Sequence, residues 1–230
     1  MDTCEAFLNA YRDLEEVLEK RYGQRAGIVQ QYASGDGHKY YEELSLFREI
    51  RNLLSHHGKI AGQSAVIPSE ASLQKLLEIL EYAKNPPVAL SVATPIESLY
   101  CAKESDTVSS TCAIMENRGF SHLPILEKNG SLKGVFSVGT LFTFTLKNPE
   151  KTTKDLKISD LWEYTPHYRH TTEKFAFTSP SSPAAELKRL FRHKGPGSRR
   201  VASVFVTSNG TEKGKVLGMI TPWDLLKIEK

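Results

Sequence analysis

The chain has 230 residues, 40% of them hydrophobic, and is therefore long enough to form one large domain or two small ones around buried cores. No apolar run reaches the ~18 residues that a membrane-spanning helix needs, and the N-terminal stretch is acidic and amphipathic, so we expect neither a membrane span nor a targeting segment. The formal net charge is +3, but residues 1–84 hold ten Lys and Arg against thirteen Asp and Glu, whereas residues 85–230 hold twenty against fourteen.

The three cysteines, Cys4, Cys101 and Cys112, are odd in number and lack the paired spacing of a zinc site or a disulfide framework. We therefore expect reduced thiols in a cytoplasmic protein. No group of residues has the spacing of metal ligands, so no metal is expected.

Residues 1–84 show hydrophobic side chains spaced by three and four positions, the pattern of amphipathic helices. This spacing predicts three long helices, with a shorter helix over 24–33 and an N-cap at Ser69. The apolar positions are Phe7, Leu8, Tyr11, Leu14, Val17 and Leu18, then Leu44, Phe47, Ile50, Leu53 and Leu54, then Leu73, Leu76, Leu77 and Leu80. The paired prolines at 86–87 cannot continue a helix. The sequence thus predicts a small helical bundle over 1–84 and a linker over 85–92.

The second long helix ends in a polar group of side chains, RNLLSHH at 51–57. Asn52 and His56 are four positions apart and share a helix face, and the long side chain of Arg51 can reach the same flank. One interpretation is a catalytic set. The other is a polar helix end, because histidines in the last turn interact favourably with the helix dipole and Gly58 follows as a stop signal.

Arg51, Asn52 and His56 match R-N-x-x-x-H, which resembles the signature of the HEPN superfamily, small helical domains that form dimers and include many metal-independent ribonucleases. The resemblance implies that His56 exchanges protons as acid and base, that Arg51 stabilises charge on the phosphorane and that Asn52 positions the substrate. It implies RNA cleavage that leaves a 2′,3′-cyclic phosphate at a site between two subunits. The region is short for this superfamily and acidic, which leaves a non-cleaving dimerisation domain as the alternative.

Residues 88–230 contain an internal repeat in which the stretch from Leu123 aligns with the stretch from Ala202. Each copy is predicted to contain a helix, two short strands around an Asn-Gly turn and a final helix. The matched residues are Asn129, Gly130, Gly134, Ser137 and Thr140 in the first copy and Asn209, Gly210, Gly218, Thr221 and Asp224 in the second. The expected fold is therefore α+β, with a helical bundle followed by two β-α-β-β-α units.

The duplicated unit resembles a pair of CBS domains, modules that occur in tandem and pack as a pseudo-two-fold Bateman module. The resemblance places repeat 1 at about 93–148 and repeat 2 at about 155–230. It implies that an adenosine-containing ligand, such as AMP, ADP or ATP, binds in a cleft between the repeats. The family pattern Gly-h-h-Thr-x-x-Asp is met in full by Gly218, Thr221 and Asp224.

Thr221 and Asp224 have two compatible interpretations. As a nucleotide site, Asp224 accepts hydrogen bonds from ribose hydroxyls while Thr221 faces a phosphate. As local structure, Thr221 caps a helix that begins with a proline and carries an acid in its first turn. Arg199 and Arg200, which enter a strand of the same repeat, are the candidates for phosphate contacts. Because Thr140 replaces the acid in the first repeat, we expect one nucleotide per chain.

Together these features predict a cytoplasmic homodimer in which an adenine nucleotide, bound to the CBS pair, regulates an RNA-cleaving helical domain. The alternative is a non-catalytic nucleotide-binding module whose helices dimerise or hold a partner. A third interpretation is direct nucleic-acid binding by the basic stretch 186–200, which has six Lys and Arg but, of interleaved aromatic residues, only Phe191.

Overall fold

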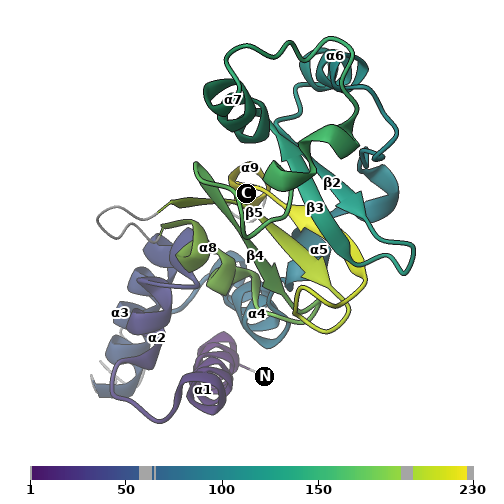
Figure 1. Ribbon diagram of the computed structural model, residues 1–230. Coiled ribbons are helices and arrows are strands. Elements are labelled where there is room, and N and C mark those ends of the chain that lie inside the picture. The colour runs from purple at the N-terminus through teal and green to yellow at the C-terminus, as the bar shows by residue number, and fades with distance from the viewer. Residues whose placement is uncertain (1, 57–63, 65, 193–198, 227–230) are drawn as a thin grey trace. The chain divides into compact units, whose positions relative to one another are not determined.

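The computed structural model describes residues 2–56, 64, 66–192 and 199–226 (Figure 1). The chain divides after Pro86 into two compact units. We refer to residues 1–86 as the helical unit and to residues 87–230 as the mixed unit. Within the described residues, no helix combines the length and the hydrophobicity that crossing a bilayer requires.

The helical unit contains the three long helices that the hydrophobic spacing predicts. These are α1 (Thr3–Tyr22), α3 (Tyr41–His56) and α4 (Glu70–Lys84), with the short α2 (Ile28–Ala33) and the 3-10 helix η1 (His38–Tyr40) between α1 and α3. Ser69 caps α4 as predicted, because its Oγ accepts a hydrogen bond from the Ser72 amide at 3.1 Å. The expected helical bundle is therefore present.

One cluster of buried side chains from all four α-helices forms the core of the helical unit. At its centre Phe7 packs edge-on against Phe47, with ring centroids 5.5 Å apart. Leu53 and Leu77, which the sequence assigns to apolar faces, are instead 36% and 40% exposed. At about 100° per residue, each lies roughly 100° from the middle of the buried stripe of its helix, so packing leaves it at the rim.

The mixed unit contains both copies of the predicted repeat. The first copy consists of β1 (Thr94–Pro95), the 3-10 helix η2 (Ile96–Ser98), α6 (Val108–Arg118), β2 (His122–Leu126), β3 (Leu132–Ser137) and α7 (Val138–Lys147). The second consists of the 3-10 helix η3 (Ile158–Tyr164), β4 (Glu173–Thr178), α8 (Ala184–Arg192), β5 (Arg200–Thr207), β6 (Val216–Ile220) and α9 (Pro222–Leu225). The predicted hairpins β2-β3 and β5-β6 are antiparallel, and Gly130 and Gly210 in their turns have φ values of 82° and 73°.

The opening segment of the first repeat pairs with the sheet of the second repeat. β1 pairs antiparallel with β6, so the second repeat has a four-stranded sheet of order β1-β6-β5-β4 and the first keeps only β2-β3. This differs from the predicted β-α-β-β-α copy, because the backbone of Thr94–Pro95 finds hydrogen-bond partners on β6 rather than within its own repeat. Part of the predicted linker forms a short helix, α5 (Ala89–Val92), and Ala89 is buried in the core of the second repeat.

The opening segment of the second repeat packs into the core of the first repeat. Ile158 and Leu161 of η3 are fully buried in a cluster that contains Phe136 of β3 and Phe144 of α7. Both side chains are apolar, so their burial stabilises the packing of η3 against the first repeat. Residues far apart in the sequence consequently meet where the repeats join.

Two glycines lie at matching positions in this junction. A Cβ built on Gly134 in β3 would lie 2.7 Å from the carbonyl oxygen of Thr165, and one on Gly218 in β6 would lie 2.7 Å from that of Thr94. Each carbonyl belongs to the opening segment of the other repeat. A side chain at either position would collide with backbone, so the close approach of the repeats requires the glycine that the sequence comparison matches.

Candidate functional site

The predicted pair Thr221 and Asp224 lies at the start of α9. The amide and the hydroxyl of Thr221 both donate hydrogen bonds to Asp224 Oδ2, each at 2.8 Å. Asp224 is 7% exposed, whereas the neighbouring Trp223 is 78% exposed. The capping interpretation is confirmed, and it places a buried carboxylate next in sequence to an exposed indole.

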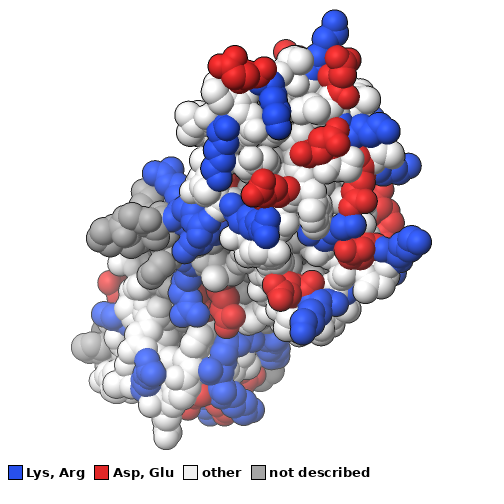
Figure 2. Space-filling view, in the orientation of Figure 1, with Lys and Arg blue, Asp and Glu red and all other residues white. Residues whose placement is uncertain are grey.

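Arg199 and Arg200 lie at the same end of the sheet as Thr221. Strand β5 begins at Arg200 and runs antiparallel to β6, with Val204 opposite Ile220. The first residues of β5 and the start of α9 therefore meet at one end of the sheet. Figure 2 shows Lys and Arg side chains gathered over α8 and the start of β5 on the visible face of the mixed unit. The expected positive charge is present there.

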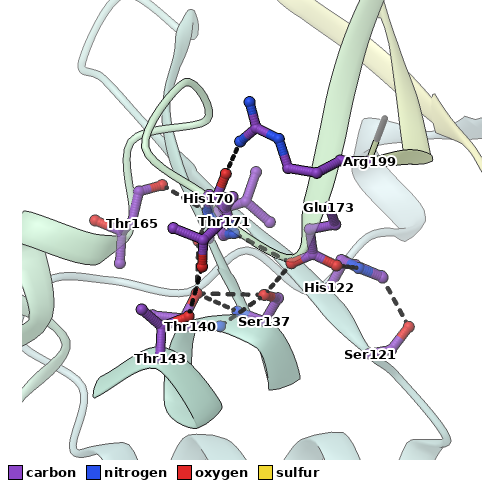
Figure 3. Close-up of polar contacts among 11 residues, drawn as sticks. Ser121, His122, Ser137, Thr140, Thr143, Thr165, His170, Thr171, Glu173 and Arg199 are labelled. Atoms are coloured by element: carbon purple, nitrogen blue, oxygen red, sulfur yellow. Dashed lines mark hydrogen bonds and ion pairs between the residues drawn. The ribbon is translucent and has the colours of Figure 1, made fainter. Parts of the chain in front are cut away.

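The two arginines differ in their local contacts. A guanidinium nitrogen of Arg199, Nη1, donates a hydrogen bond to the carbonyl of His170 (Figure 3). Arg200 is exposed, and its Cα pairs with that of Glu173 on β4. Residues 193–198, which belong to the basic stretch 186–200, lie outside the described residues.

The first repeat has a corresponding set of hydrogen bonds at the start of α7. Ser137 Oγ accepts a hydrogen bond from the Thr140 amide at 3.1 Å, and Thr140 Oγ1 accepts one from the Ser137 amide at 3.1 Å. Both side chains are buried. Thr140 thus stands at the position of Asp224, as the sequence comparison predicts, and supplies a hydroxyl where the second repeat has a carboxylate.

A carboxylate nevertheless reaches this place from the other repeat. Glu173, the first residue of β4, lies between Ser137, His122 and His170 (Figure 3). Glu173 Oε1 is 2.5 Å from Ser137 Oγ and 3.1 Å from His170 Nδ1, and Oε2 is 2.7 Å from His122 Nε2. We refer to these four residues as the Glu173 cluster. Two of them come from each repeat, so the cluster spans the junction.

The family model described as CBS domain matches the chain twice, over residues 86–146 and 168–230, which together make up more than half of it. The chain belongs to the CBS-domain family. It carries two CBS domains in tandem, and residues 1–85 lie outside both matches. In these terms the Glu173 cluster joins the first CBS domain to the second.

Several solved structures are similar to part of the chain. AcuB from Vibrio cholerae, described as an acetoin utilization protein, is 17% identical with a TM-score of 0.45, over 62% of this chain and 89% of that chain. CBSX2 in complex with AMP is 17% identical with a TM-score of 0.42, over 61% and 93%. The CBS domain of a bacterial CNNM/CorC family Mg²⁺ transporter in complex with ATP is 18% identical with a TM-score of 0.43, over 62% and 86%. No curated protein sequence is significantly similar to the chain.

Glu173 is ionised at neutral pH. Burial would raise its pKa, but hydrogen bonds from His122, His170 and Ser137 together outweigh burial and hold the pKa well below the ordinary 4.5. An ionised carboxylate only accepts hydrogen bonds, so each imidazole nitrogen that faces it must carry a proton. His122 can donate from Nε2, because Ser121 Oγ, 2.8 Å from its Nδ1, can donate to the other nitrogen.

Both ring nitrogens of His170 face hydrogen-bond acceptors. Its Nδ1 faces the Glu173 carboxylate, and its Nε2 lies 3.1 Å from the carbonyl oxygen of Val135 and 3.2 Å from that of Thr165. An ionised carboxylate and a carbonyl only accept hydrogen bonds, so the ring has acceptors on both sides. The side chains of His170 and Glu173 are 1% and 15% exposed. They therefore form a largely buried contact within the second CBS domain, where that domain meets the first.

Sequence reasoning missed the Glu173 cluster. Glu173 is 51 positions from His122 and 36 from Ser137, in the other CBS domain, so no local spacing connects them. Two signals point to it in retrospect. The first domain has Thr140 where the second domain has Asp224, and His170-x-x-Glu173 places a base and an acid at the start of β4, which borders the junction.

On α3 the structure brings two of the three predicted catalytic residues into contact. Arg51 Nη1 lies 3.3 Å from Asn52 Oδ1. Arg51 Nη2 also lies 3.4 Å from Glu15 Oε1 on α1, and the guanidinium carbon is 5.7 Å from the centroid of the Tyr11 ring. His56 is the last residue of α3 and is exposed, about one turn beyond Asn52.

Tyr11, whose ring lies beside Arg51, does not exchange protons near neutral pH. Burial, with a contribution from Glu15, raises the pKa of Tyr11 to about 12 even though Arg51 opposes the shift. Tyr11 is therefore a neutral phenol near neutral pH. Among the residues that the structure describes, no group of three or more His, Cys, Asp or Glu side chains could hold a metal ion.

Proposed function

We propose that this tandem CBS protein is a sensor that binds an adenine nucleotide at its second CBS domain. The observation that carries the proposal is the buried Asp224 carboxylate, fixed by two hydrogen bonds from Thr221 at the start of α9. A carboxylate oxygen can accept more than one hydrogen bond, so Asp224 can hold a ribose hydroxyl together with Thr221. Arg199 and Arg200, at the same end of the sheet, supply cations for the phosphates.

One nucleotide per chain is the expected stoichiometry. The first CBS domain has Thr140 in place of the acid, so a ribose there has no charged acceptor within the helix. The nucleotide acts as a regulator when it binds one arrangement of the protein better than another. AMP and ATP, the ligands of two of the solved structures named above, are the first probes, with ADP as the third.

A thermal-shift panel with AMP, ADP and ATP tests the sensor. At a concentration of 100 times the dissociation constant, the bound nucleotide should stabilise the wild type by about 2.7 kcal/mol. Asp224→Asn should lose the shift. Asp160→Asn is the matched control, because Asp160 Oδ2 accepts the Lys157 amide at 2.8 Å in a similar cap at η3. The proposed site is rejected if no nucleotide shifts the unfolding of the wild type. It is also rejected if Asp224→Asn shows the same shift as the wild type.

A second proposed function is RNA cleavage by the helical unit without a metal, regulated by the nucleotide. It is supported by the contact between Arg51 and Asn52 and by an exposed histidine, His56, about one turn further along α3. In this proposal His56 exchanges the proton of the 2′-hydroxyl or the leaving group, Arg51 stabilises the phosphorane and Asn52 positions the RNA. The product is a 2′,3′-cyclic phosphate.

Incubation of the full-length protein with a mixed RNA pool and EDTA tests this activity. His56→Ala and Arg51→Ala should each reduce cleavage at least 100-fold, on the order of a lost acid/base or charge-stabilising group. His38→Ala, which removes another exposed histidine of the helical unit, should cleave like wild type. Equal cleavage by all four proteins would point to a contaminating nuclease.

The alternative is a non-catalytic interaction module. It is supported by the ion pair of Arg51 with Glu15, which draws the guanidinium to α1 and partly neutralises it. This alternative predicts nucleotide binding without RNA turnover. Glu15→Gln distinguishes the ribonuclease from the non-catalytic module, because it frees Arg51 from the ion pair. RNA cleavage should rise if the site is catalytic, and no cleavage should be seen if the ion pair is only structural.

We also propose that the protein is a homodimer. Val138, Phe142 and Leu146 are 59%, 59% and 70% exposed and recur every four residues along α7, so they form an apolar stripe on one face of that helix. A second copy of the chain is the partner that presents the same stripe. Exposure of this apolar stripe to water is unfavourable, and its burial against the same stripe of a second copy would stabilise a dimer.

A further inference from the structure

The start of α7 holds a carboxylate that does not belong to its own domain. In the second CBS domain, Asp224 lies in the first turn of α9 and accepts both hydrogen bonds from Thr221. In the first domain Thr140 stands at that position, and Glu173 of the second domain accepts a hydrogen bond from Ser137, the N-cap of α7. A contact between domains thus supplies the carboxylate that the first domain lacks.

The groups around this carboxylate are of the kind that bind oxyanions. Ser137 and His122 contribute donors from the first domain, and His170 contributes one from the second. Glu173 Oε1 also lies close to the first turn of α7, because a Cβ built on Gly139 would be 2.8 Å from it. The N-terminus of this ten-residue helix carries partial positive charge that favours an anion.

Contacts that do not involve Glu173 hold this frame in place. His170 Nε2 is fixed by two carbonyls, and Arg199 donates to the carbonyl of His170, which adds a positive charge beside the cluster (Figure 3). Thr171 Oγ1 lies 3.2 Å from Thr143 Oγ1 on α7. The donors should therefore keep their positions when the carboxylate is removed.

We propose that Glu173 is an internal ligand of the first CBS domain, whose carboxylate occupies an oxyanion site at the start of α7 and keeps phosphate groups out of it. Without the carboxylate, Ser137, His122 and His170 lose the buried acceptor that they share, which is costly. A phosphate oxyanion supplies acceptors for Ser137, His122 and His170 together. The inference goes beyond the proposed function, because it concerns the first domain and needs no nucleotide at the second.

The test compares the full-length wild type with Glu173→Ala, which empties the position, and Glu173→Gln, which fills it with a neutral amide. Inorganic phosphate is titrated at constant ionic strength while NMR follows the imidazole signals of His122 and His170. Thermal unfolding gives a second readout. The control is Glu212→Gln, because Glu212 Oε2 lies 3.0 Å from His167 Nε2 in a pair outside the cluster.

In Glu173→Ala, both imidazole signals should move saturably with phosphate, and the unfolding midpoint should rise by about 5 °C at 100 times the dissociation constant. The wild type, Glu173→Gln and Glu212→Gln should not respond. The proposal is overturned if folded Glu173→Ala ignores phosphate, or if the wild type responds as strongly as Glu173→Ala.

Two further arms keep the result decisive. If Glu173→Ala does not fold, the same titration is made on Glu173→Ser. Recovery of folding by phosphate, but not by chloride of equal ionic strength, supports the site. If phosphate restores folding of neither variant, the proposal is overturned. Asp224→Asn combined with Glu173→Ala separates this inference from the nucleotide sensor. The double variant should keep its phosphate response whether or not any variant binds a nucleotide.

Discussion

Ser137 Oγ donates a 2.5 Å hydrogen bond to Glu173 Oε1, and this contact joins the start of α7 in the first CBS domain to the first residue of β4 in the second. The other oxygen of the same carboxylate binds His122 of the first domain at 2.7 Å. One side chain thus ties the two domains together through both of its oxygens. Its charge should govern how stable the mixed unit is and how that stability depends on pH.

Glu173→Gln should destabilise the protein by about 3 kcal/mol at pH 7, because it removes the buried charged acceptor shared by Ser137, His122 and His170. Urea denaturation followed by far-UV circular dichroism measures the change. Glu212→Gln is the control. Its partner His167 loses a carboxylate that is 53% exposed, so a loss of at most about 1 kcal/mol is expected. Equal stability of Glu173→Gln and wild type would show that the cluster does not hold the domains.

The stabilisation by Glu173 should vanish in acid. Its pKa is lower in the folded protein than the ordinary 4.5, so its contribution is fully present above that value and is lost as pH falls through the lower, folded value. The difference in unfolding free energy between wild type and Glu173→Gln should therefore be constant from pH 7 to about 5 and shrink below that. A difference that stays constant down to pH 3 would contradict the lowered pKa.

Gly134→Ala and Gly218→Ala should each destabilise the mixed unit by about 1–3 kcal/mol, since the new Cβ would lie 2.7 Å from a backbone carbonyl of the other domain. Gly35→Ala provides the comparison, because the nearest atom to its Cβ would be at 3.4 Å. Thermal unfolding of the three variants measures the effect. If Gly134→Ala and Gly218→Ala unfold at the wild-type midpoint, the domains do not approach each other as closely as described.

Phe142→Glu should convert the proposed dimer to a monomer, because it places a charge in the middle of the apolar stripe on α7. Ser109→Glu puts the same charge on an exposed position of α6 and should leave the dimer intact. Sedimentation velocity reports the two states directly. A wild type that sediments as a monomer at all concentrations would rule out the dimer, and an unaffected Phe142→Glu dimer would place the interface elsewhere.

Much of the fold could be predicted because its signals are local. The spacing of Phe7, Leu14 and Leu18 identifies α1 without any knowledge of its partners, and the matched Asn-Gly turns reveal both hairpins. The capping role of Thr221 and Asp224 follows from a four-residue pattern in the same way. Each of these features is complete within one short stretch of chain.

The remaining features depend on contacts between distant residues. The pairing of β1 with β6 and the reach of Glu173 to Ser137 arise only when the two repeats exchange their opening segments. Nothing in the spacing of His122 or His170 shows that both will face one carboxylate. On α3, the sequence indicates that Arg51 can approach Asn52, but the ion pair with Glu15 depends on how α1 packs against α3.

The central claim is that Asp224 of the second CBS domain holds the ribose of an adenine nucleotide. A crystal structure of the full-length protein, grown with the nucleotide that gives the largest thermal shift, tests it most directly. We predict one nucleotide per chain, with ribose hydroxyls about 2.5–3.0 Å from the Asp224 carboxylate. A saturating nucleotide found at another place, with Asp224 contacting only the protein, would contradict it.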